Sequence, residues 1–247
     1  MAQFSSEVVD AMAKNTKKKD DPIKKFEVFD RSYDLPYQSQ GTRGKTKDRI
    51  LMEATILFAR QGFAAVSMKD IADAVQVQAA SLYNHFDSKE TLWKAVLTHA
   101  KELYLLFFVH MEEQIQQAAS FEAVLAALFD EPEKMDNQFT CYAFSLIQAE
   151  QFRDAYASEI FGKYLLQYAI DFVKAQLDAC VDKGMVPPFD TLTTAAQYSH
   201  TVLIGIELSV QKLMGRPTPY APGEMVARLH QLLLDTLCPK APIGDTE

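Results

Sequence analysis

The segment Ser67–Phe86, SMKDIADAVQVQAASLYNHF, constrains this chain more than any other, because it predicts two short helices separated by a tight turn. Ser67 stands where a helix N-cap is expected, and Asp70 three residues later places negative charge near the positive end of the helix. An apolar face at helical spacing follows, formed by Ile71, Ala72 and Val75. The spacing is typical of a helix-turn-helix.

The second helix is expected from Ala79 to His85, anchored by Val77 and Leu82. Small and polar residues remain after the core positions are assigned: Gln78, Ala79, Ser81, Tyr83 and Asn84. Such residues hydrogen-bond base edges and phosphates, or let the backbone approach a groove wall. A helix pair of this length is also common in all-α proteins, so the pair alone leaves DNA binding open.

The flanking segments predict further helices around this pair. Thr46–Arg60 is strongly amphipathic, and Gly62 can close it with a left-handed cap. Its apolar stripe consists of Ile50, Leu51, Ala54, Leu57 and Phe58. Ser88 opens a long helix that reaches about Gln117, roughly 45 Å at 1.5 Å per residue. This helix would join the helix-turn-helix to the rest of the chain as one rigid element.

The order ILMEATILFARQGF, then S-x-x-D-I-A, then S-L-Y-N-H-F-x-S-K-E-x-L resembles the N-terminal domain of tetracycline-repressor-type (TetR) regulators, over Thr46–Leu97. Two positions depart from the family pattern: Gln76 replaces the usual glycine of the turn, and Gln78 replaces a serine or threonine. A positive φ at Gln76 would be strained. The resemblance implies an all-α fold, with a three-helix DNA-binding domain joined by a long helix to a helical ligand-binding and dimerisation domain.

Composition and charge agree with this division. The chain of 247 residues is 48% hydrophobic, which allows a sizeable core. We expect a flexible arm over residues 1–42, a DNA-binding domain over 43–97 and an effector-binding and dimerisation domain over 98–240. Residues 43–101 hold nine basic and six acidic residues, net +3, whereas residues 102–247 hold nine and twenty, net −11. The positive charge thus gathers where DNA phosphates would be bound.

The predicted DNA-binding residues join the basic cluster to the helix-turn-helix. They are Arg43, Lys45, Lys47, Ser67, Gln78, Ala79, Ser81, Tyr83, Asn84, His85 and Lys89. The amides of Gln78 and Asn84 suit an adenine edge. The alternative for each basic residue is an ordinary solvated charge. Basic residues between Lys14 and Lys25 would add nonspecific contacts, or belong to an uninvolved tail.

The C-terminal region predicts a helical bundle rich in aromatic residues. Helices are expected at about 120–130, 137–151, 157–183, 190–214 and 223–237, with proline and glycine at the breaks. The resemblance implies an effector cavity, for which we predict Tyr104, Phe108, Met111, Tyr142, Gln148, Tyr168 and Phe172. The alternative is that these aromatics form a plain core.

The last two helices carry apolar faces that could pack on their own domain or on a second copy of the chain. The family resemblance implies a four-helix interface in a homodimer, which would set two recognition helices about one DNA turn apart. The residues predicted for this interface are Tyr198, Val202, Ile206, Val210, Val226, Leu229 and Leu233.

Catalysis is not expected, because the five histidines form no metal-ligand or nucleophile pattern and no glycine-rich phosphate loop is present. We predict no cofactor and no metal. The separated cysteines Cys141, Cys180 and Cys238 are interpreted as core residues of a cytoplasmic protein. No membrane span or signal peptide is predicted.

Two functions remain. The first is a repressor, released from a palindromic double-stranded DNA operator by a small apolar or aromatic effector. The second is a DNA-binding or scaffold protein with a solid core, controlled by a protein partner or constitutively active. A closed cavity of several hundred Å³ would favour the first, and a solid interior would favour the second.

Overall fold

The computed structural model describes residues 43–129, 138–221 and 223–238. The expectations for the N-terminal arm therefore lie outside the described residues. The helices are α3 (Arg43–Gln61), α4 (Met68–Val75), α5 (Ala79–Tyr83), α6 (Lys89–Gln116), α7 (Phe121–Phe129), α8 (Gln138–Glu150), α9 (Ala155–Ile160), η2 (Phe161–Tyr168), α10 (Ala169–Asp182), α11 (Thr191–Leu213) and α12 (Glu224–Leu237).

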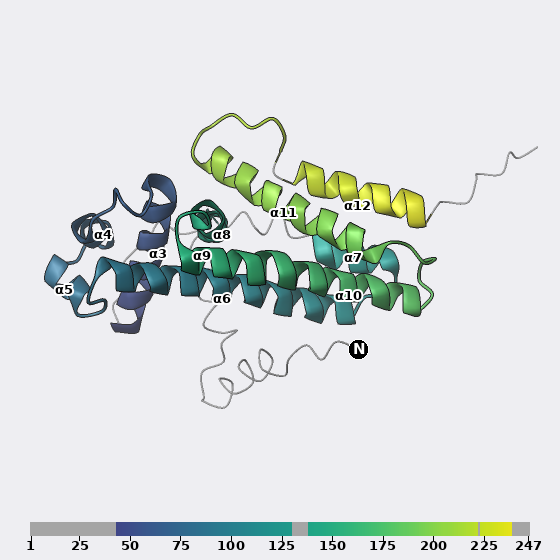
Figure 1. Ribbon diagram of the computed structural model, residues 1–247, viewed down its shortest axis with the longest axis horizontal. Coiled ribbons are helices and arrows are strands. Elements are labelled where there is room, and N and C mark those ends of the chain that lie inside the picture. The colour runs from purple at the N-terminus through teal and green to yellow at the C-terminus, as the bar shows by residue number, and fades with distance from the viewer. Residues whose placement is uncertain (1–42, 130–137, 222, 239–247) are drawn as a thin grey trace, which may run out of the picture. The chain divides into compact units, whose positions relative to one another are not determined.

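The all-α fold is confirmed, since the described ranges hold helices and no strand (Figure 1). Helix α3 packs on α4 and on α6, and α4 packs on α5. We call these three helices, together with the start of α6, the head. Its interior is apolar and fully closed, lined by Ile50, Phe58, Ile71, Leu82 and Leu92. Burial of these side chains is the main stabilising term that holds α3, α4 and α5 together.

Two caps fix where the head's helices begin and end. Ser67 and Asp70 form the expected capping box: the Ser67 hydroxyl accepts from the Asp70 N–H, and an Asp70 carboxylate oxygen accepts from the Ser67 N–H at 2.7 Å. Gly62 ends α3 with φ of 83°, as its left-handed cap requires. Each cap depends on residues that are close together in the chain, so both could be predicted from the sequence.

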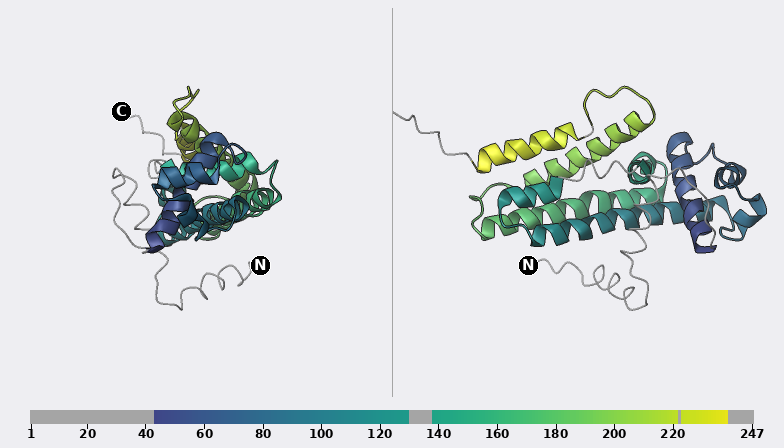
Figure 2. Two further views of the ribbon diagram at one scale, coloured as in Figure 1. Left: turned by 90° about the vertical axis from the view of Figure 1, so that its left-hand side faces the viewer. Right: turned by 180° about the vertical axis from the view of Figure 1, so that it is seen from behind.

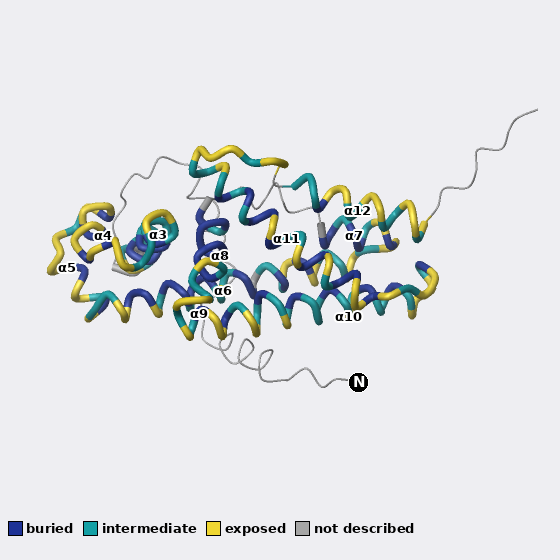
Figure 3. Tube along the Cα trace, turned by 45° about the horizontal axis from the view of Figure 1, so that its top comes forward, coloured by how far each residue is buried: buried dark blue, intermediate teal, exposed yellow. Residues whose placement is uncertain are grey.

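The remaining helices form a bundle around the rest of α6. Helix α8 packs on both α6 and α11, α10 packs on α11, and α12 packs on α7 and α11. Figure 2 shows α11 and α12 adjacent in the view from behind as well. Helix α8 is the most enclosed element, with most of its length buried in Figure 3. Helix α6 is continuous from the head into the bundle, about 42 Å for 28 residues.

The segment expected as one α-helix over 157–183 is continuous but not uniform. It comprises α9, the π-helical segment η2 and α10, and the backbone stays right-handed helical at both junctions. In a π-helix each N–H bonds the carbonyl five residues back, which is rare and often found at functional sites. Apolar periodicity cannot distinguish this from an α-helix at such a length, so the sequence did not predict it.

The cysteine interpretation holds in part. Cys141 and Cys180 are buried, but Cys238 follows the end of α12 and is exposed, so it is not a core residue. Within the described ranges no group of three His, Cys, Asp or Glu side chains is arranged to hold a metal ion. A search of the same ranges found no helix with the length and apolarity needed to cross a membrane.

Candidate DNA-binding surface and effector pocket

The recognition helix α5 has one buried anchor and an exposed reading face. Leu82 is fully buried, whereas the predicted reading residues are exposed or half-buried: Gln78, Ala79, Ser81, Tyr83 and Asn84. Helix α5 ends at Tyr83, so it is shorter than expected, and Asn84 and His85 lie in the following turn. Gln78 is the N-cap residue of α5, but its side-chain amide makes no capping hydrogen bond to the helix.

The turn between α4 and α5 contains a left-handed residue that is not glycine. Gln76 has φ of 58° and ψ of 46°, and its N–H bonds carbonyls at the end of α4. This confirms the strained position expected there. The guanidinium of Arg49, on α3, donates a 2.6 Å hydrogen bond to the carbonyl of Val75, the last residue of α4. Arg49 thereby ties α3 to the start of the turn, a contact that the sequence did not reveal.

Two of the predicted phosphate-binding lysines lie on aromatic rings of the head. The Lys47 ammonium lies 5.6 Å from the centre of the Phe86 ring. The Lys89 ammonium lies 4.3 Å from the centre of the Phe63 ring and 3.5 Å from the Ala64 carbonyl oxygen. Cation–π contacts of this kind hold an ammonium group in place while it remains hydrated. The side chains of Arg43 and Lys45 lie outside the described part of the structure.

Charge at the start of α4 is set by the capping box. Hydrogen bonds from the Ser67 hydroxyl and N–H lower the pKa of Asp70, and the positive charges of Lys69 and Lys89 act in the same direction. Asp70 therefore stays ionised at neutral pH. Ser67, a predicted DNA contact, has its hydroxyl 2.6 Å from an Asp70 carboxylate oxygen, so a DNA phosphate would have to compete with that bond.

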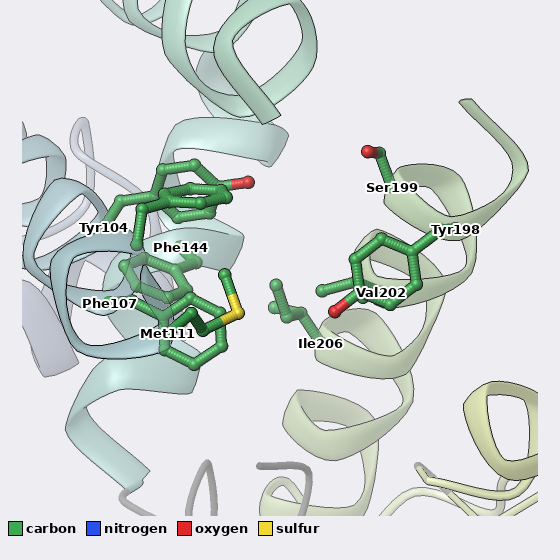
Figure 4. A pocket seen from close by; sticks show the side chains of 9 residues that line it. Tyr104, Phe107, Met111, Phe144, Tyr198, Ser199, Val202 and Ile206 are labelled. Atoms are coloured by element: carbon green, nitrogen blue, oxygen red, sulfur yellow. The ribbon is translucent and has the colours of Figure 1, made fainter. Parts of the chain in front are cut away.

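The candidate effector pocket lies between α6, α8 and α11 (Figure 4). Its lining consists of Tyr104, Phe107, Phe108, Met111, Phe144, Tyr198, Ser199, Val202 and Ile206. None of these side chains carries a charge at neutral pH. The rings of Phe108 and Phe144 stand edge-on to Tyr104, with ring centres 5.1 and 5.0 Å from it. The lining therefore suits a neutral, apolar or aromatic molecule.

The pocket is almost filled in this conformation. Its free volume is about 10 Å³, room for roughly one water molecule. Both tyrosine hydroxyls are committed, because Tyr104 donates to the Leu165 carbonyl at 3.4 Å and Tyr198 donates to the Leu128 carbonyl. Burial raises the pKa of both tyrosines, which keeps them neutral. This pocket is thus far smaller than the cavity of several hundred Å³ that would favour a ligand-responsive repressor.

The predicted pocket residues divide into two groups. Tyr104, Phe108 and Met111 line the pocket, but the other four do not. Tyr142 faces away, in a cluster with residues of α3 and α11 that includes Ile56 and Val210. Tyr168 and Phe172 pack on the Phe108 ring from η2 and α10. The side-chain oxygen of Gln148 is buried without a hydrogen-bond partner among the described residues.

The face expected to bind a second copy is largely interior. Tyr198, Ile206, Val210 and Val226 are at most 5% exposed in the single chain, and Val202 lines the pocket. Their own bundle already covers Tyr198, Ile206, Val210 and Val226, whereas Val202 is half-buried. The regular spacing of apolar residues along α11 identifies the side of the helix that packs inside its own bundle. Leu229 and Leu233 are half-buried.

A different apolar pair on the last two helices is exposed. Ile204 on α11 is 49% exposed and Leu232 on α12 is 61% exposed. Several positions of α12 are exposed in Figure 3, and that helix borders solvent along one side. Ile204 was missed because apolar periodicity selects the buried stripe of a helix.

The head is similar in sequence to known proteins. Residues 50–96 match the family described as "Bacterial regulatory proteins, tetR family". The HTH-type transcriptional repressor KstR2 of Rhodococcus jostii is 42% identical over 64 residues, which cover 25% of this chain and 31% of that protein. The IcaR negative transcriptional regulator of the biofilm operon icaADBC in Staphylococcus aureus is 42% identical over 48 residues, 19% of this chain and 26% of that protein. The chain thus matches less than a third of the length of these curated relatives.

Solved structures extend the likeness beyond the head. A TetR-family transcriptional regulator from Mesorhizobium loti has a TM-score of 0.57 at 16% identity, covering 80% of this chain and 99% of its own. The SmeT–triclosan complex has a TM-score of 0.61 at 16% identity, covering 78% and 91%. AibR in complex with isovaleryl coenzyme A and operator DNA has a TM-score of 0.54 at 17% identity, covering 76% and 97%.

At these identities the structural likeness establishes the fold. The shared fold is an all-α head with a helix-turn-helix, continued by one long helix into a helical bundle. Residues 50–96 match the sequence of the TetR family, and the described chain has the fold of solved structures of TetR-family regulators.

Proposed function

We propose that this protein is a transcriptional repressor that binds an inverted-repeat operator as a homodimer and is released by a small apolar or aromatic effector. The observation that carries the proposal is the continuity of α6. This one helix begins at Lys89 beside the recognition helix, and further along it supplies Tyr104, Phe108 and Met111 to the pocket. A rigid helix shared by both sites is a physical means by which occupancy of one can alter the other.

The effector class follows from the lining of the pocket. Because all nine lining side chains are uncharged, a charged ligand would lose its hydration without gaining an opposite charge. Aromatic and aliphatic walls favour a neutral molecule of similar character. Two proteins of this fold are known with small molecules: SmeT in complex with triclosan, and AibR in complex with isovaleryl coenzyme A and operator DNA.

The filled pocket defines how such an effector would act. With about 10 Å³ free, a ligand cannot enter unless the aromatic side chains move apart. The closed conformation would then be the one that binds DNA, and ligand binding would favour a wider one. A ligand shifts such an equilibrium only by its difference in affinity for the two states.

Dimerisation is assigned to the outer faces of α11 and α12, with Ile204 and Leu232 at the centre and Leu229 and Leu233 beside them. An isologous contact through these faces would place the two heads in a two-fold arrangement, and the operator would mirror that symmetry. A regulator of this kind would work beside the chromosome, in the cytoplasm of a bacterium.

The alternative is a DNA-binding or scaffold protein with a solid core, acting constitutively or under a protein partner. The nearly filled pocket between α6, α8 and α11 favours it, since about 10 Å³ holds no effector. Both functions include binding to an operator, but only the first includes release by a small molecule.

Selection from random double-stranded DNA by the full-length protein tests the shared part. The proposal predicts an inverted repeat whose half-sites lie about one helical turn apart. Recovery of a single unrepeated half-site would contradict the dimeric operator, and recovery of no sequence preference would contradict operator recognition itself.

A further inference from the structure

The head and the bundle meet through a hydrogen bond between two residues that no motif indicated. The indole Nε1–H of Trp93, near the start of α6, donates to Asp154 Oδ2 at 3.1 Å. The other carboxylate oxygen of Asp154 accepts from the Ala157 N–H at 2.8 Å and caps the start of α9. One carboxylate therefore fixes the end of a bundle helix and the position of Trp93.

Trp93 is embedded in the head. Its ring centre lies 5.3 Å from that of Phe58, on α3, with the planes at 83°, and 5.0 Å from that of Phe63. Only 5% of the residue is exposed. Because packed aromatic rings have few alternative arrangements, a displacement of the indole must be passed to α3.

The helix that Asp154 caps also reaches the pocket. Helix α9 continues into η2, and the Leu165 carbonyl of η2 accepts the hydrogen bond from the Tyr104 hydroxyl. A π-helical segment carries a bonding pattern one residue wider than that of an α-helix. If it relaxes to α-helical bonding, the helix on one side of it, α9 or α10, must shift in register. In the route inferred below, the helix that shifts is α9.

We propose that Trp93 and Asp154 are positioning residues that transmit the state of the pocket to the DNA-binding head, through Tyr104, the Leu165 carbonyl and α9. The inference rests on the proposed function, since it names the route by which an effector would act. A ligand that displaces the Tyr104 ring breaks its bond to Leu165, and the resulting movement of η2 and α9 reaches the indole through Asp154.

A competing route also exists between the bundle and the head. Ile56 and Ala59 of α3 pack against an apolar cluster on α8 and α11, formed by Cys141, Tyr142, Val210, Leu213 and Met214. Apolar contacts of this kind are not directional and tolerate sliding. The hydrogen bond of Trp93 has a defined geometry and is either made or broken, which suits two discrete states.

The test is a double-mutant cycle with a substitution that crowds the pocket in place of a ligand. Val202 faces Tyr104 and Phe107 across the pocket in Figure 4, so Val202→Phe should force these rings apart. Trp93→Phe keeps an aromatic ring against the head and removes the N–H donor. Asp154→Asn retains an oxygen to cap α9, because asparagine is a good N-cap, but presents an amide N–H to the indole.

The first readout is affinity for the selected operator. Val202→Phe is expected to weaken operator binding at least about tenfold in the wild-type background and less than about threefold when combined with Trp93→Phe or Asp154→Asn. The matched control is Tyr164→Phe, which removes a hydroxyl from η2 and leaves both bonds of the route intact. It should leave the tenfold effect unchanged.

Equal weakening by Val202→Phe in all backgrounds would overturn the route and favour the apolar cluster. No weakening in the wild-type background would overturn both the route and control by the pocket, whereas the proposed DNA binding would stand. Ile206→Phe repeats the experiment if the first crowding variant does not fold.

The second readout does not need an operator. Trp93 is the only tryptophan of the chain, so its fluorescence emission reports its surroundings directly. Val202→Phe should shift the emission toward that of Asp154→Asn, and Tyr164→Phe should not. Unchanged emission in Val202→Phe would contradict the route even if the operator proposal fails.

Discussion

Arg49 donates a 2.6 Å hydrogen bond to the carbonyl of Val75, which ends α4 one residue before the left-handed Gln76. A guanidinium anchored at this point holds the turn from which the recognition helix departs. Arg49 belongs to the basic cluster near the N-terminus of the described chain. In the structure it stabilises the DNA-binding head from within, and its role is not that of a surface charge.

We therefore expect Arg49→Met to lower the free energy of unfolding by about 1.5–3 kcal/mol, because a charged hydrogen bond is lost and a partly buried carbonyl is left without it. Operator affinity should fall as well, since the turn is less well fixed. Urea denaturation and operator titration measure the two effects. Arg60→Met, an exposed site on the same helix, is the control and should change stability by less than about 0.5 kcal/mol.

Two substitutions should distinguish a residue that reads bases from a residue that binds phosphates. Gln78→Ala removes an exposed amide and should relax the preference at one operator position, by about 1–3 kcal/mol. Lys89→Ala should weaken binding to all sequences alike and reduce the slope of log affinity against log salt by about one. An unchanged slope of log affinity against log salt would mean that Lys89 does not bind a DNA phosphate. Its role would then be limited to its contacts with the Phe63 ring and the Ala64 carbonyl.

Removal of a buried aromatic side chain should lower the free energy of unfolding more than removal of an exposed one. Phe108 is 3% exposed and contacts four rings of the pocket region, so Phe108→Ala should lower the free energy of unfolding by about 3–5 kcal/mol. Phe152 is 87% exposed in the turn after α8, and Phe152→Ala should change it by less than about 0.5 kcal/mol. Similar values for both variants in chemical denaturation would contradict the assignment of Phe108 to the core.

The proposed dimer face can be tested by placing a charged side chain in it. Ile204→Glu or Leu232→Glu would bring a carboxylate into the centre of the proposed interface, where it is desolvated and unpaired. Each is expected to convert a dimer into a monomer in sedimentation or native mass spectrometry, with the helical content unchanged. Leu192→Glu, at the first turn of α11, is an exposed control that should remain dimeric. A dimer that persists in all three variants would exclude this face.

The head could be predicted from the sequence because its signals are local. The cap formed by Ser67 and Asp70, the glycine at position 62 and the anchor Leu82 each act within a few residues, and the structure has all of them. The approximate bounds of the bundle helices followed from proline, glycine and apolar spacing for the same reason.

The bundle's sites depend on how the helices are rotated against one another, which no local signal fixes. Tyr142 and Tyr104 looked equivalent as aromatic residues of a bundle, but Tyr142 packs toward α3 and Tyr104 lines the pocket. Val202 and Ile206 were assigned to the dimer face because an apolar stripe looks the same whether it meets its own bundle or a second copy. The bond between Trp93 and Asp154 joins residues 61 positions apart and leaves no trace in periodicity.

The central claim, control of DNA binding by the pocket, is tested most directly by titrating small neutral aromatic compounds, triclosan among them, against the protein with and without its selected operator. The account predicts that at least one compound releases the operator, and that the operator weakens binding of that compound by the same factor. About 100-fold release corresponds to roughly 2.7 kcal/mol of coupling. A compound that enters the pocket with equal affinity in the presence and absence of operator would contradict the account.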